Sequence, residues 1–176
     1  MSQRYGSVHV GRDRAFVVRL QRLVTEDDRG ALAMLRRGLR GAPGNEPAMH
    51  KYVVPWLGDE KGWREDVYYL VASMFAFHPT SWPEDSDDKD PNLGASFARL
   101  SRSDGGSVEA VERRFTVLLS THQEDLHAQL RHAVSLLKSK DVPVDWVLLL
   151  SDLRWWGNDD RSVQRRWAKA FWGQTP

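Results

Sequence analysis

The chain has 176 residues, of which 41% are hydrophobic and 28% charged, and it carries a net charge of +1 and no cysteine. This composition is that of a globular protein with a core of its own, and it excludes disulfides, thiolate zinc sites and cysteine nucleophiles. No segment has the apolar core of a signal peptide or the length of a membrane span, so we expect a cytoplasmic protein without a membrane partner.

Helical periodicity dominates the N-terminal part of the sequence. The segment Asp13–Val24 places its apolar residues on one stripe, and Trp63–Phe77 is apolar on most sides, which predicts a buried central helix. Thr25 is expected to cap the second helix, because the three acids after it suit the positive end of a helix dipole. Pro55 and Gly58 are expected to close the third helix. The helices predicted in this part are 13–24, 26–40, 47–54 and 63–77.

A break without periodicity follows at residues 78–91, which hold three prolines and five acids. We expect a solvated acidic loop at 84–90, which either repels nucleic acid or docks on a basic neighbour. A short helix is predicted at Asn92–Leu100. The Ser, Asp and Gly residues that continue to Gly106 predict a hinge.

The remaining sequence predicts four helices. Thr121 and Glu124 have the spacing of a capping box at the start of the second, and Pro143 suits the first turn of the third. No segment alternates with the period of a strand. We therefore predict an all-α fold of two small helical bundle lobes, 1–104 and 105–176, joined by the short hinge. The helices predicted in the second lobe are 107–119, 121–138, 144–155 and 158–172.

The motifs of an enzyme are missing from the sequence. None of the six histidines belongs to an H-E-x-x-H motif, and His122, His127 and His132 are spaced five apart, which is poor for a metal site on one helix face. There is no glycine-rich phosphate loop and no G-x-S-x-G nucleophile elbow. We expect a protein that is not an enzyme and that holds neither a metal nor a cofactor.

Arginine on predicted helices is the chemistry that remains. Residues 1–40 hold nine arginines against four acids, although the whole chain is almost neutral. Arginine binds phosphate with two parallel hydrogen bonds and reads no sequence through such contacts, whereas the low net charge suggests that other subunits supply much of the affinity. The alternative is that these cations lie on solvated helix faces and helix ends. The candidate nucleic-acid-binding residues are Arg19, Arg36, Arg37, Arg99, Arg102, Arg113, Arg114, Arg131 and Lys138.

The eight tryptophans are more consistent with a core than with stacking platforms for bases, because most lie beside Leu or Val on apolar stripes. Trp155 and Trp156 are adjacent. At most one of two neighbouring helical residues can face the centre of the core.

Several short segments carry a resemblance to a known family. They are Pro91–Leu100 with its Asn-Leu-Gly, Val111–Leu119 with its Glu-Arg-Arg-Phe, and Gln129–Leu137 with its Gln-Leu-Arg, followed by the Pro-Val-Asp-Trp of residues 143–146 and by Trp155-Trp156. In this order and spacing they resemble the CasB family, the small subunit of the type I-E CRISPR complex called Cascade. The similarity spans residues 13–173.

The resemblance implies a function that the composition alone does not indicate. CasB-type subunits pair with each other within Cascade, have no active site, touch the guide RNA and the target DNA, and stabilise the R-loop. Carried over by position, Arg36 and Arg37 match a paired basic site, while Arg113, Arg114 and Arg131 match arginines of the two motifs. His132 stands where some relatives carry a second arginine. The implied partners are guide RNA, target DNA, the other Cascade subunits and a second copy of the chain.

Two other functions remain open at this stage. The turn Gly157-Asn158, with Arg161, Arg165 and Arg166 on the helix after it, is compatible with a stand-alone DNA-binding regulator whose second helix enters the major groove. The near-zero net charge is compatible with a pure protein scaffold.

Overall fold

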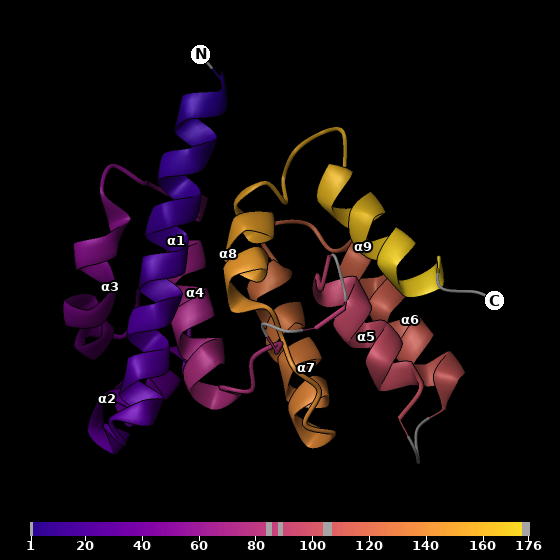
Figure 1. Cartoon of the computed structure of the whole chain (residues 1–176), viewed down its shortest axis with the longest axis horizontal. Coiled ribbons are helices and arrows are strands. Elements are labelled where there is room, and N and C mark those ends of the chain that lie inside the picture. The colour runs from indigo at the N-terminus through magenta and orange to yellow at the C-terminus, as the bar shows by residue number, and fades with distance from the viewer. Residues whose placement is uncertain (1, 84–85, 88–89, 104–106, 174–176) are drawn as a thin grey trace. The chain divides into compact units, whose positions relative to one another are not determined.

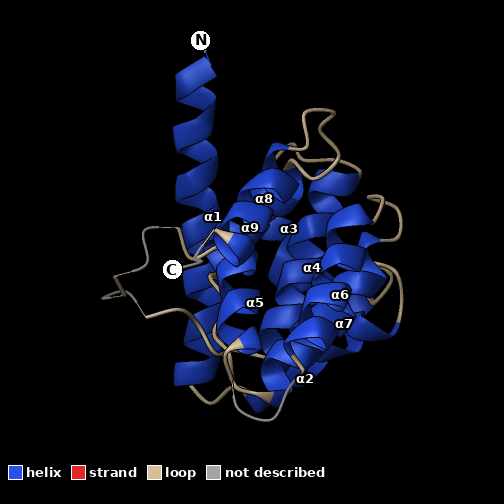
Figure 2. Ribbon diagram, turned by 90° about the vertical axis from the view of Figure 1, so that its right-hand side faces the viewer, coloured by secondary structure: helices blue, strands red, loops and turns tan. Residues whose placement is uncertain are grey.

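The computed structural model describes residues 2–83, 86–87, 90–103 and 107–173, and the side chains of α1 from Val10 onward. Within these residues the regular elements are all helices (Figures 1 and 2), and the pairing of Ser81 with Val144 is an isolated parallel bridge. The predicted all-α class is confirmed. The α-helices are α1 Ser2–Thr25, α2 Arg29–Arg37, α3 His50–Leu57, α4 Trp63–Phe77, α5 Leu93–Ser101, α6 Val108–Ser120, α7 Leu126–Ser139, α8 Trp146–Arg154 and α9 Ser162–Trp172; the 3-10 helices are η1 Gly38–Arg40 and η2 Pro47–Met49.

The chain divides into two compact units, Met1–Pro79 and Thr80–Pro176. This boundary differs from the predicted division at 104/105, because α5 packs against α6, α7 and α9 and so belongs with the C-terminal helices. The predicted hinge includes residues 104–106, and the predicted acidic loop includes residues 84, 85 and 88, all of which lie outside the described residues.

Unit 1 is built around α4, against which α1, α2 and α3 pack. Ten consecutive residues of α4, from Val67 to Ala76, are buried, which confirms the predicted central helix. Phe16 of α1 meets the ring of Tyr68 edge-on at 5.1 Å, and the Tyr68 hydroxyl donates to the buried carboxylate of Asp13 at 2.7 Å. The apolar stripe read from the sequence of α1 is therefore the face that packs on α4.

Two local predictions in unit 1 are wrong. Thr25 ends α1, and the residue that caps α2 is Asp28, whose carboxylate accepts from the Ala31 amide at 2.9 Å. The chain reverses at Asp27, which has a φ of 52°, so the acids after Thr25 form a turn rather than a first helical turn. Pro55 lies inside α3 and does not end it.

The centre of unit 2 is α5, in which seven of nine residues are buried. Asn92 caps this helix: its side-chain oxygen accepts from the amides of Gly94 at 2.9 Å and Ala95 at 3.3 Å. A Cβ atom on Gly94 would overlap the carbonyl oxygen of Trp167 and lie 2.7 Å from its carbonyl carbon. Glycine at 94 therefore allows α9 to lie directly on α5, as Figure 1 shows.

Two helix starts in unit 2 also differ from the prediction. Thr121 is the C-terminal cap of α6, with its hydroxyl donating to the Val117 carbonyl, so it forms no capping box with Glu124. α7 begins five residues later, at Leu126. α8 begins at Trp146 after the cap Asp145, whereas Pro143 precedes the helix.

Removing the Asn92 cap is expected to lower the free energy of unfolding of unit 2 by about 2 kcal/mol, because Asn92→Ala leaves the buried amide of Gly94 without its acceptor and the amide of Ala95 with only the main-chain carbonyl of residue 92. Ser107→Ala removes the exposed cap of α6 and should cost only about 0.5 kcal/mol. Urea unfolding of both variants measures the difference. Equal costs would contradict the role given to Asn92.

Candidate nucleic-acid interface

Three of the predicted site residues lie in unit 1. Arg36 and Arg37 occupy the last turn of α2, where the negative end of the helix dipole favours cations, and both are exposed. The Arg36 Nε donates to the Leu32 carbonyl at 3.1 Å, which orients its guanidinium along the helix. Arg19, on α1, pairs with Glu26 at 3.5 Å, and both side chains are largely exposed, so this ion pair contributes little.

Arg12, on the same helix as Arg19, is used inside unit 1. Its guanidinium donates to the Glu60 carboxylate at 2.6 Å, to the Leu57 carbonyl at 3.2 Å and to the Tyr68 hydroxyl at 3.1 Å. Arg12 is therefore a structural residue, in contrast to the exposed Arg36 and Arg37.

The two basic residues of α5 are both exposed. The guanidinium of Arg99 lies over the ring of Trp82, 5.5 Å from its centroid, and the Trp82 indole donates to the Ser86 hydroxyl at 2.8 Å. This stacking fixes the plane of the Arg99 side chain at the surface. Arg102 is the C-terminal cap residue of α5.

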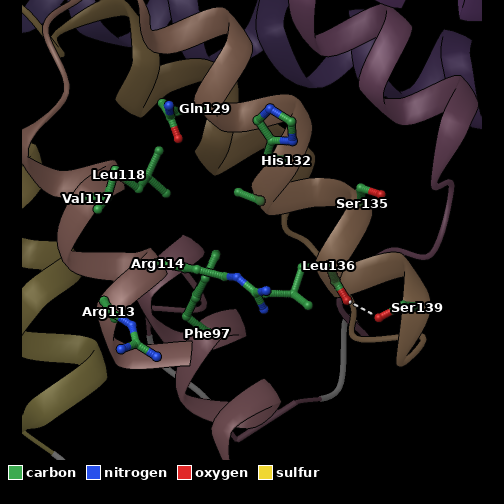
Figure 3. Close-up of a pocket in the computed structure, with 11 residues that line it drawn as sticks. Phe97, Arg113, Arg114, Val117, Leu118, Gln129, His132, Ser135, Leu136 and Ser139 are labelled. Carbon is green, nitrogen blue, oxygen red and sulfur yellow. Dashed lines mark hydrogen bonds between the residues drawn. The ribbon is translucent and has the colours of Figure 1, made fainter. Parts of the chain in front are cut away.

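Unit 2 has an open hollow that lies between α6 and α7 and has a residue of α5 at its base (Figure 3). We call it the α5–α7 hollow, after the three helices that line it. Its volume is about 560 Å³, and eleven residues line it. The floor is apolar and buried, with Phe97 from α5, Leu118 from α6 and Ala133 from α7, while the exposed Val117 and the half-buried Leu136 lie at its sides. Two of the predicted site residues, Arg113 and Arg114, also line it.

Arg113 and Arg114 are neighbours on α6, so their side chains leave the helix about 100° apart. In Figure 3 Arg114 extends from α6 toward Leu136 of α7, whereas Arg113 is directed to the opposite side. Arg113 acts on Glu109, whose pKa is lowered first by the hydrogen bond from Ser107 and in part by the Arg113 charge. Among the described residues no carboxylate forms an ion pair with Arg114.

Polar side chains of α7 form the other wall of the hollow: Gln129, His132, Ser135 and Ser139. Ser139 donates to the Leu136 carbonyl at this wall, as Figure 3 shows. The side chains of Gln129, His132 and Ser135 make no hydrogen bond to any other described residue. Of these four residues only His132 was considered from the sequence as a contact position. The spacing of 129, 132, 136 and 139, which repeats along one helix face, was the available signal.

Arg131 and Lys138 are the remaining predicted residues, and they lie on another side of α7. By the 3.6-residue repeat they are about 140° and 160° around the helix from Leu136. Neither lines the hollow. Lys138 is exposed and Arg131 is half-buried.

The arginines expected of a recognition helix are largely engaged inside unit 2. Arg161 donates to the Leu119 carbonyl, and Arg166 binds both the buried Asp152 carboxylate and, at 3.5 Å, Asp90. The Trp167 indole donates to the same Asp152 at 2.6 Å. Burial raises the pKa of the Asp152 carboxyl, although the Trp167 and Arg166 hydrogen bonds act in the opposite direction. This arrangement is a structural clamp between α8 and α9, and it does not favour a helix that reads the major groove.

The tryptophans behave as the sequence indicated. Trp156 is buried and packs against Trp167 with the rings tilted by 54° and their centroids 5.0 Å apart, while its neighbour Trp155 is 43% exposed. Trp146 is buried as well. The exposed Trp155 is the member of the pair that does not face the core.

Among the described residues no three His, Asp or Glu side chains come together in a way that could hold a metal ion. No described helix combines the length and the hydrophobicity that crossing a bilayer requires.

Comparison with known proteins gives consistent matches. Residues 31–172 match the family model for CRISPR-associated protein Cse2. A Cse2 protein of Thermus thermophilus is 33% identical over 145 residues, 81% of this chain and 79% of that protein. The crystal structure of M. ruber CasB is 31% identical with a TM-score of 0.71, covering 92% of this chain and 93% of that one. A chain of a CRISPR RNA-guided surveillance complex, pre-nicking, is 28% identical with a TM-score of 0.79, covering 92% of both.

Proposed function

The chain belongs to the Cse2 family of CRISPR-associated proteins, and we propose that it is a non-catalytic, nucleic-acid-binding subunit of a CRISPR surveillance complex. The observation that carries this proposal is the match to a chain of an RNA-guided surveillance complex over 92% of both chains. In that setting its partners are the other Cascade subunits, a second copy of itself, the guide RNA and the target DNA.

The proposed mechanism is contact with the phosphate backbone by exposed arginines of both units. An RNA–DNA heteroduplex is about as stable as the DNA duplex that it replaces, so modest protein contacts to the backbone can tip the exchange toward the R-loop. Base pairing with the guide reads the sequence, and the protein needs only charge and shape. The exposed Arg36 and Arg37, at the C-terminal end of α2, and Arg113 and Arg114, at the α5–α7 hollow, support this mechanism.

Neutralising Arg36 and Arg37 together is expected to weaken target-DNA binding by the reconstituted complex roughly tenfold near physiological salt. Each lost phosphate contact should also flatten the dependence of log affinity on log salt by about one unit, so the double Gln variant should lose about two. Arg131→Gln tests unit 2 in the same way. Affinity and R-loop formation are measured at several salt concentrations.

Arg29→Gln is the matched control for the unit 1 variant. Arg29 is an exposed arginine of the same helix, but it pairs with Asp27 at 3.0 Å at the opposite helix end. We expect the complex that carries Arg29→Gln to bind target DNA with unchanged affinity. Unchanged affinity and salt slope in both the Arg36/Arg37 and the Arg131 variants would contradict the phosphate contacts. Loss of assembly without loss of nucleic-acid binding would instead favour a scaffold.

A further inference from the structure

The α5–α7 hollow combines arginines with an apolar floor and polar walls, whereas a phosphate contact requires only the arginines. Backbone phosphates can be bound by exposed arginines on any convex helix face, as Arg36 and Arg37 are placed. Here Arg113 and Arg114 instead border a cavity of about 560 Å³ with a buried apolar floor. This volume lies within the range of cavities that hold small organic ligands, about 300–1,000 Å³. The combination points to a ligand with both an anionic and a flat, partly apolar part.

The walls of the hollow narrow the class of ligand further. Val117 and Leu136 present aliphatic surface from two different helices, while Gln129, His132 and Ser135 present polar atoms that no other described residue engages. An amide, an imidazole and a hydroxyl can each donate or accept a hydrogen bond. Such groups accommodate the edges of different bases, and aliphatic walls accept the face of any base. The hollow thus suits a nucleotide without dictating which one.

Resting on the proposed function, we infer that the α5–α7 hollow holds one unstacked nucleotide of a single strand, with the base on the apolar floor and the phosphate on Arg114, which extends across the hollow. A duplex cannot fill the hollow, because its bases are stacked and paired and only its phosphates reach the protein. A single strand presents a base at much lower cost. The site therefore makes this unit selective for single-stranded nucleic acid.

A helix of a protein partner is the less suitable occupant. A helix docks through a continuous apolar stripe with anchors at i, i+3, i+4 and i+7. The α7 wall of the hollow is instead polar at Gln129, His132, Ser135 and Ser139, and the guanidinium group of Arg114 extends toward it from α6. These groups would face the apolar stripe of such a helix without partners.

The test compares two strands that carry the same phosphates. The purified full-length chain is titrated at low salt with a fluorescent oligothymidine and with an oligomer of equal length made of abasic sugar phosphates. We expect the strand with bases to bind roughly tenfold more tightly, which lies within the range that stacking of one base contributes in other single-strand-binding proteins. A duplex of the same length should bind like the abasic strand. Thymidine monophosphate, as the free form of the ligand, should not displace the strand at comparable concentration.

Two variants separate the base from the phosphate. Ser135→Leu fills the hollow from an exposed position without changing the charge. It should bring the ratio of the affinity for the strand with bases to the affinity for the abasic strand close to one, while the affinity for the abasic strand stays unchanged. Arg113→Gln with Arg114→Gln should weaken binding of both strands. Thr116→Leu, which likewise places a leucine on an exposed residue, here on α6 outside the hollow, is the control and should change neither. Circular dichroism confirms that each variant is folded.

The outcomes distinguish this inference from the proposed function. Equal binding of both strands, with the arginine variants still weaker, overturns the nucleotide site and leaves the phosphate contacts standing. No change with any variant overturns both at this unit. Displacement by thymidine monophosphate overturns the assignment to a strand in favour of a free nucleotide. A Ser135→Leu variant that binds both strands normally but fails to join the complex overturns the site in favour of a protein partner.

Discussion

Alanine in place of Gly94 is expected to destabilise unit 2 by about 3 kcal/mol and to lower its melting temperature by about 12–24 °C. The added methyl group would overlap the Trp167 carbonyl, which is main chain in the middle of α9 and cannot move aside as a flexible side chain does. The two helices must therefore separate, and the buried residues of α5 lose contact with α9. Urea and thermal unfolding followed by tryptophan fluorescence measure the loss.

Gly11→Ala is the control for this substitution. Gly11 lies within α1, and no atom comes within 4 Å of a Cβ built on it. Alanine has the higher helix propensity, so this variant should be neutral or more stable by up to about 1 kcal/mol. A Gly94→Ala protein that unfolds at the wild-type urea concentration would contradict the close approach of α5 and α9.

Asp152→Ala is expected to lower the free energy of unfolding of unit 2 by about 3 kcal/mol. The substitution leaves the buried indole N–H of Trp167 without an acceptor and removes the main carboxylate partner of Arg166. Both losses occur where α8 meets α9, so the neighbouring rings of Trp156 and Trp167 should report them as a change in fluorescence.

Two variants serve as comparisons for Asp152→Ala. Asp159→Ala removes an exposed carboxylate from the turn between the same helices and should change stability by less than about 0.5 kcal/mol. Asp152→Asn keeps an oxygen that can accept from Trp167 but loses the charge, and should fall between the wild type and Asp152→Ala. If Asp152→Ala and Asp159→Ala were equally stable, the clamp between α8 and α9 would have no energetic importance.

The sequence predicts a helix well where its apolar periodicity is strong, and less well where a capping residue determines the helix end. The helix Trp63–Phe77 has the predicted bounds, because its apolar segment begins directly after the N-terminal cap Gly62 and ends directly before the C-terminal cap His78. Thr25 and Thr121 satisfy the local pattern of an N-terminal cap, yet both end a helix, since each hydroxyl donates back to a carbonyl three or four residues earlier. A side chain with both a donor and an acceptor fits either end, and the sequence alone does not distinguish the two.

The candidate site was predictable in its charges and not in its shape. Eight of the nine predicted basic residues are exposed and Arg131 is half-buried, as expected for arginine on helix faces. The α5–α7 hollow depends on how α6 and α7 lie over Phe97, which is a property of tertiary packing. Conversely, the internal bonds of Arg12, Arg161 and Arg166 arise from partners distant in sequence, such as Glu60, Leu119 and Asp152.

The contact between Gly94 and Trp167 also sets an order of events during synthesis. α5 leaves the ribosome well before α9, and at about 5–20 residues per second several seconds pass between them. During that interval the side of α5 that α9 later covers remains in contact with water and accessible to other chains. Unit 1, whose helices all precede Thr80, can close meanwhile. The nascent chain thus carries a finished N-terminal unit and an unfinished C-terminal one, and the latter is the part that a chaperone would need to protect.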